Sequence, residues 1–187
     1  DALIIKILSI SIVVFHLYTG VFGLLPLFQQ RAIHVALVLS LAFLVYPSRI
    51  RWLDIFAILV IITSCKFIYS NYLIFSPFMV RSINTYEIIL GILTTLIILE
   101  VSRRTTGLAL PIIVLLAFFY TIFGHQFISG YWSPPVIKFS NFMTHLYFGV
   151  GAIWGFLTGL SASYIALFII FGSLFLKTGA GKILMDL

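Results

Sequence analysis

Long apolar runs separated by short polar breaks constrain this sequence more than any other feature. A helix needs roughly 20 apolar residues to cross the ~30 Å hydrocarbon core of a bilayer. Six runs meet or approach that length: residues 4–25, 32–46, 50–69, 86–101, 107–124 and 146–176. The polar and aromatic stretch at residues 125–145 suits the membrane–water interface, because it contains Tyr131 and Trp132. The pattern predicts an all-α integral membrane protein, a polytopic bundle of about six transmembrane helices with an interfacial segment before the last.

Composition excludes an ordinary soluble domain. Hydrophobic residues make up 62% of the 187 positions and charged residues only 9%, against roughly 25% charged in a soluble domain. A soluble chain of this size leaves about 30% of its unfolded surface exposed to water and needs polar residues to cover it. Such residues are too few here, so the excess apolar surface is expected to face lipid.

The charge balance is basic, with eleven Lys and Arg against five Asp and Glu and a net charge of +6. The basic residues occur singly or in pairs between apolar runs. They form neither the aromatic-interleaved basic face nor a motif of a nucleic-acid-binding protein. We therefore expect membrane lipids, and no nucleic acid, as partners of these charges.

The positions of the positive charges predict the orientation, since cytoplasmic loops carry the excess of Lys and Arg. With a cytoplasmic N-terminus, seven basic residues fall in inside segments: Lys6, Arg49, Arg51, Arg103, Arg104, Lys177 and Lys182. Three fall in outside segments: Arg31, Arg81 and Lys138. This ratio favours a cytoplasmic N-terminus. The start at Asp1 lacks the basic region of a signal peptide, so we expect a first membrane helix there, with further residues upstream.

Ionisable residues inside membrane helices are costly, and they are candidates for function by default. Three carboxylates lie close to the ends of predicted helices: Asp54, Glu87 and Glu100. Glu100 precedes Arg103 and Arg104 by three and four residues, the spacing at which helical side chains meet, so an interfacial ion pair is expected. Lys66 lies deeper in its run and is expected to extend its ammonium group toward the interface.

The sequence assigns no metal or catalytic site. The four histidines lie apart: His16, His34, His125 and His145. No two share a metal-ligand spacing, and the chain has neither HExxH nor CxxC. His16 is expected to be a hydrogen-bonded structural residue, and Cys65 a small buried side chain. Because Ser161, Ser163 and Cys65 lack an evident base partner, the chain is expected not to be an enzyme.

Several stretches, taken together and in order, resemble the start of the fused permease of TRAP transporters of the TAXI type. In the first part of the chain they are residues 16–23 (HLYTGVFG), 30–34 (QRAIH), 43–47 (FLVYP), 100–104 (EVSRR) and 107–113 (GLALPII). In the last part they are residues 159–164 (GLSASY), 168–172 (FIIFG) and 177–181 (KTGAG). The similarity extends over nearly the whole chain.

The resemblance implies a secondary transporter of the bacterial or archaeal cytoplasmic membrane. Such systems take organic anions, often carboxylates, from a periplasmic substrate-binding protein and import them with a Na⁺ or H⁺ gradient by an elevator mechanism. Residues 1–105 would form the four-helix small-subunit scaffold. Residues 106–187 would form a connecting helix and the first elements of the large transport subunit. The rest of that subunit, which holds the ion and substrate ligands, is expected beyond Leu187, so no such ligand is assigned here, and no cofactor besides the coupling ion.

Two other functions remain open at the level of sequence. A stand-alone membrane anchor or assembly protein would bind another membrane complex and move no solute. A small intramembrane enzyme would depend on a polar cluster whose substitution abolishes turnover, and the sequence reveals no such cluster.

Overall fold

The computed structural model describes residues 2–71, 83–149 and 151–179, and every element in these ranges is helical. The elements are α1 (Ala2–Phe22), α2 (Leu27–Val45), α3 (Arg51–Ser70), α4 (Thr85–Thr106), α5 (Ala109–Phe127), η1 (Gly130–Trp132), α6 (Phe139–Phe148), α7 (Phe156–Leu160), η2 (Ser161–Ile165) and α8 (Ala166–Thr178). Elements α7, η2 and α8 form one continuous helical stretch. With that stretch counted once, six helices are long and apolar enough to cross a membrane. The predicted all-helical class and the six long apolar helices are confirmed.

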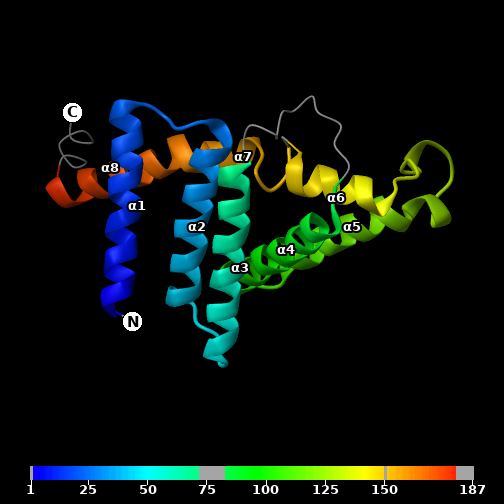
Figure 1. Cartoon of the computed structure of the whole chain (residues 1–187), viewed down its shortest axis with the longest axis horizontal. Coiled ribbons are helices and arrows are strands. Elements are labelled where there is room, and N and C mark those ends of the chain that lie inside the picture. Colours follow the sequence, from blue (N-terminus) through cyan, green and yellow to red (C-terminus); the bar gives the residue numbers. More distant parts are fainter. Residues whose placement is uncertain (1, 72–82, 150, 180–187) are drawn as a thin grey trace.

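Helices α1, α2 and α3 stand side by side, with α2 in the middle (Figure 1). Helices α4 and α5 form a hairpin in which α4 packs on α3. The hairpin runs obliquely away from α3, and α6 lies against α4 (Figure 1). The stretch from α7 to α8 runs crosswise over α2 and then α1. The last described part of the chain therefore returns to pack on the first two helices.

Local chemistry explains the boundaries of the α4–α5 hairpin. Asn84 caps α4 in a capping box, in which its backbone N–H donates to Glu87 Oε2 at 2.9 Å. The helix ends at Gly107, whose φ of 89° is readily adopted only by glycine. Pro111 lies in the first turn of α5, where a missing backbone N–H removes no helical hydrogen bond.

The boundary between the first two helices differs from the prediction. The polar residues after Pro26 were expected to form a loop, with the second helix starting at residue 32. Instead α2 begins at Leu27, and Gln30 and Arg31 are buried within it. Pro26 is the N-cap of α2, a place where its rigid φ is tolerated. Gln30 finds hydrogen-bond partners on α1 and η2, and Arg31 finds one at the Trp154 carbonyl in the turn before α7.

The second half of the chain also departs from the predicted runs. Helix α5 extends to Phe127, and α6 (Phe139–Phe148) occupies much of the segment expected at the interface. The last apolar run, expected at residues 146–176, is interrupted: residues 146–148 end α6, and after a turn at residues 151–155 the chain is helical again from Phe156. Tyr131 and Trp132 are exposed; their interfacial position stays a prediction. Two of the positive charges used to predict the orientation, Arg81 and Lys182, lie outside the described residues.

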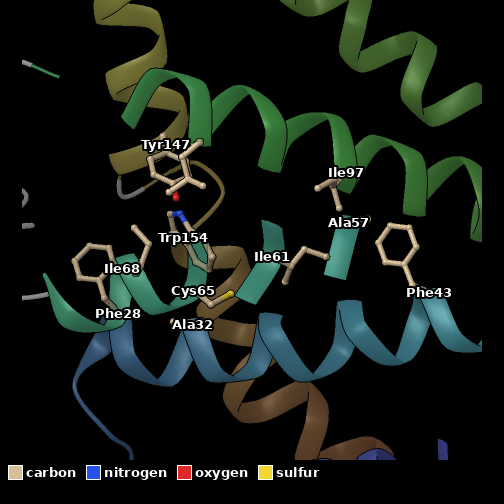
Figure 2. Close-up of a cluster of buried hydrophobic side chains, with 11 residues drawn as sticks. Phe28, Ala32, Phe43, Ala57, Ile61, Cys65, Ile68, Ile97, Tyr147 and Trp154 are labelled. Atoms are coloured by element: carbon tan, nitrogen blue, oxygen red, sulfur yellow. The ribbon is translucent and has the colours of Figure 1, made fainter. Parts of the chain in front are cut away.

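The apolar core lies between α2, α3 and α4 and is closed by two aromatic side chains from the region of α6 (Figure 2). Its members include Phe28, Phe43, Ile61, Cys65, Ile68, Tyr147 and Trp154. The predicted burial of Cys65 is confirmed. Many large apolar side chains of α1, α5 and α8 are exposed, which is the surface expected to face lipid.

A hydroxyl network links this core to α6. Ser64 of α3 is hydrogen-bonded to the Tyr147 hydroxyl and lies 2.9 Å from the Thr94 hydroxyl of α4. Three helices are thereby held together by buried side chains whose hydrogen-bonding groups are satisfied.

Close packing of α4 against α6 predicts the effect of a substitution at Gly91. A Cβ there would lie 3.1 Å from Met143 Cε and 3.2 Å from Tyr147 Cγ. We expect Gly91→Leu to lower the free energy of unfolding by about 1–3 kcal/mol through overpacking, measured as a lower thermal midpoint in detergent. Gly172→Leu on α8 is the matched control, because no described atom lies within 4 Å of a Cβ there. Equal midpoints for the two variants would contradict this packing.

Candidate functional site

Buried polar side chains gather where the start of α2 meets α1 and the α7–η2 stretch. Gln30, Arg31 and His34 of α2 are only 4%, 7% and 7% exposed. His16 and Thr19 of α1 are 1% and 3% exposed. Residues three or four apart share a helix face, so His16 and Thr19 present one polar face and Gln30 and His34 present another. These two faces meet, and we name the five residues the polar cluster.

A chain of three hydrogen bonds runs through the two histidines. His16 Nδ1 donates to the Ile12 carbonyl oxygen at 2.7 Å. With neutral rings, His16 Nε2 is then an acceptor, and it receives a hydrogen bond from His34 Nδ1 at 2.9 Å. His34 Nε2 accepts in turn from the Ser161 hydroxyl at 3.1 Å. One carbonyl therefore determines the tautomer of both rings and the direction of the whole chain.

Gln30 uses its side-chain amide to join three segments. Its Nε2 donates to Thr19 Oγ1 at 3.2 Å and to the Ala162 carbonyl at 3.1 Å. Its Oε1 accepts from the backbone N–H of Leu25 at 3.4 Å. Both amide hydrogens and the amide oxygen are thus used, which is the condition for burying an amide at little cost.

The segment that receives these bonds, η2, is one turn of π-helix between α7 and α8. A π-turn departs from the regular helical hydrogen-bond pattern, and such turns are frequent at functional sites. Here the turn presents the Ser161 hydroxyl to His34 and the Ala162 carbonyl to Gln30.

Arg31 lies beside this network and contacts α7. Its Nη1 donates to the Trp154 carbonyl at 2.6 Å. A Cβ at position 159 would lie 2.7 Å from Arg31 Nη2 and 2.8 Å from its Nε. Gly159 therefore leaves the space that the guanidinium occupies. Among the described residues, no carboxylate forms an ion pair with Arg31.

The prediction that Ser161 lacks a base partner was wrong, because His34 Nε2 lies within hydrogen-bond distance of its hydroxyl. A hydroxyl–imidazole pair is the start of a serine nucleophile, which also needs a group that stabilises the positive charge formed on the imidazole. The other partner of His34 is His16, a second imidazole rather than a carboxylate. The arrangement suits a structural hydrogen-bond chain or the relay of a proton along its length.

The expected ion pair is confirmed at the opposite end of α2. Arg103 and Arg104 each lie within 2.8 Å of the Glu100 carboxylate. Arg104 also donates to Asp54 at 2.7 Å and to the Tyr46 carbonyl at 2.9 Å. This four-residue group, Asp54, Glu100, Arg103 and Arg104, is named the ion cluster, and it joins the ends of α2, α3 and α4.

The remaining ionisable residues do not converge on a site. Lys66 and His145 are exposed, and His125 Nδ1 is buried with no hydrogen-bond partner among the described residues. Within residues 2–71, 83–149 and 151–179, no three His, Cys, Asp or Glu side chains come together as metal ligands would. The pairing of His16 with His34 was missed from the sequence, although both belong to the quoted motifs.

No protein-family model, curated protein or solved structure matches this chain. Function therefore has to be inferred from the motifs and from the geometry of the polar cluster. That cluster is the candidate functional site.

The hydrogen-bond chain makes a spectroscopic prediction. We expect both His16 and His34 to carry their proton on Nδ1 at neutral pH. The reason is that the Ile12 carbonyl oxygen can accept a hydrogen bond but cannot donate one. Long-range proton–nitrogen correlation spectra of protein labelled at its histidine nitrogens would report this directly. His16→Phe and His34→Phe assign the signals, and His145→Phe is the exposed control. A proton on Nε2 of either ring would contradict the chain.

Different burial of the two arginines of the ion cluster predicts different costs of removing them. The Arg104 side chain is 13% exposed and its partner Asp54 is 9% exposed, so Arg104→Gln leaves a buried carboxylate without its cation. A loss of about 3–5 kcal/mol in the free energy of unfolding is expected. Arg103 is 51% exposed, and Arg103→Gln is expected to lower stability far less, because water screens an exposed ion pair. Unfolding titrations in mixed micelles measure both, and similar losses would contradict the assignment.

Proposed function

We propose that this chain is the N-terminal membrane scaffold part of a binding-protein-dependent secondary transporter. It would serve the import of organic anions, carboxylates among them, with a Na⁺ or H⁺ gradient and an elevator mechanism. Its partners would be a periplasmic substrate-binding protein and the remainder of the large transport subunit. The basis is the ordered set of motifs that resembles the TAXI-type fused permease.

One structural observation carries the proposal beyond a list of motifs. Three of the motifs, at residues 16–23, 30–34 and 159–164, supply the residues that meet at the polar cluster. Gln30 and Ala162, which are hydrogen-bonded, are 132 positions apart in sequence. The motifs thus form one contact region of the fold, which is consistent with treating them as parts of one unit.

The same contacts suit the proposed division of the chain. In this proposal, residues 1–105 form the scaffold and residues 106–187 begin the transport subunit. The polar cluster then joins α1 and α2 of the scaffold to α7 and η2 of the transport subunit. The buried hydrogen bonds of Gln30 and His34 would fasten the first elements of the transport subunit to the scaffold.

Placement in the cytoplasmic membrane with the N-terminus inside belongs to the proposal. The exposed apolar side chains of α1, α5 and α8 favour contact with lipid. Arg31 is buried in α2 rather than exposed in a loop, which removes one of the three charges counted outside. Seven basic residues in inside segments are then compared with two in outside segments, Arg81 and Lys138. The preference for a cytoplasmic N-terminus becomes stronger.

Uptake by reconstituted protein tests the proposal. The complete reading frame, placed in vesicles with the substrate-binding protein encoded beside it, is expected to accumulate the anion that this binding protein carries. Uptake should fall to background without the binding protein or without the ion gradient. His34→Phe is expected to lower the initial rate several-fold, whereas the exposed His145→Phe is expected to retain it.

Two observations together would contradict the transport proposal. If the reading frame ends close to Leu187, and the chain co-purifies with another membrane complex without moving solute, it is an anchor or assembly protein. The transport proposal would then be wrong.

A further inference from the structure

A cleft of about 310 Å³ opens between the segment that connects α1 to α2, the start of α2 and the α7–η2 stretch. Most of its wall is apolar, formed by leucines, Phe156 and Gly159. Its polar lining comes from Gln30, Arg31, Ser163 and Tyr164. The volume is at the lower end of ligand sites, which run from about 300 to 1,000 Å³, so the cleft suits a head group or a small anion.

The unbalanced charge of Arg31 is the main evidence that this cleft holds a ligand. Arg31 is 7% exposed, yet its hydrogen bond among the described residues goes to a neutral carbonyl, that of Trp154. A guanidinium carries five N–H donors, and a buried cation is strongly destabilising without a compensating anion. Arg31 Nε and Nη2 lie beside Gly159, which also lines the cleft. The missing negative charge therefore belongs in the cleft.

The N-terminal end of α2 is a second source of positive electrostatic potential. Leu27, the first residue of α2, lines the cleft. The N-cap, Pro26, provides no side-chain cap for the first backbone N–H groups. The N-terminus of a 19-residue helix carries a partial positive charge that favours an anion. The helix end and the guanidinium thus act on the same space.

We infer that the cleft binds an oxyanion, a phosphate or a carboxylate, on Arg31, and that in the membrane this oxyanion is the phosphate of a phospholipid. The planar fork of a guanidinium matches two oxygens of such a group. The apolar wall favours the lipid as its source, because Leu24, Leu27 and Phe156 are 57%, 51% and 66% exposed and would lie against the glycerol and the first part of the acyl chains. This inference does not depend on the proposed transport function.

Retention of phospholipid by the purified chain is the test. Native mass spectrometry after mild detergent extraction, with added phosphatidylglycerol, is expected to show one retained phospholipid on the unaltered chain. Arg31→Gln is expected to lower its occupancy about tenfold, the loss of one charge-assisted pair. Lys66→Gln removes an equal charge from an exposed site on α3 and is expected to retain the lipid. Equal retention by Arg31→Gln and the unaltered chain would overturn the inference.

A second variant keeps the test decisive if Arg31→Gln does not fold. Leu27→Trp replaces a half-exposed side chain and fills the cleft while leaving Arg31 in place. We expect it to fold and to lose the phospholipid. Full retention by Leu27→Trp would equally overturn the inference.

Soluble anions identify the source of the oxyanion. Inorganic phosphate and succinate at millimolar concentration are compared with phosphatidylglycerol for their effect on the thermal midpoint. Stabilisation by the phospholipid alone, lost in Arg31→Gln, supports the lipid. Stabilisation by phosphate or succinate, lost in the same variant, supports the oxyanion site and overturns the lipid as its source. No Arg31-dependent stabilisation by any of the three would overturn the site itself.

Discussion

The structure depends on the pairing of polar side chains inside helices that are otherwise apolar. Contacts between apolar faces have little directional preference and, in lipid, little driving force. A buried polar group without a partner costs about 2–7 kcal/mol, so the requirement for partners selects one arrangement among many. Gln30 and His34 on one helix determine where α1 and η2 lie. The apolar residues of α2 then fill the space around those contacts.

The features predicted from sequence are those determined by near neighbours in the chain. Apolar runs identified the long apolar helices because length and hydropathy are local properties. The spacing of Glu100 to Arg103 and Arg104 identified an ion pair because one turn of helix brings these side chains together. Asp54 joins them across 50 positions, and no local pattern could have included it.

The features that were missed depend on distant partners. A polar residue at the end of an apolar run looks like a loop unless its partner is known, and Ser161 lies 127 positions after His34. For this reason the start of α2 was placed too late, and Arg31 was assigned to the loop before it. One signal was present: His16 and Thr19, like Gln30 and His34, are spaced to share a helix face. Reading polar residues for helical spacing would have found both faces, although not their meeting.

Helix α2 is held at both ends, by the polar cluster near its start and by the ion cluster near its finish. Sliding it along its axis by one turn would break the hydrogen bonds of the polar cluster and the bond from Arg104 to the Tyr46 carbonyl at once. Helix α2 is therefore expected to keep its position between α1 and α3. Helices α5 and α8, whose faces are largely apolar and exposed, have few polar bonds to lose when they shift. Any large movement in this part of the protein is expected to leave α2 still and to displace its apolar neighbours.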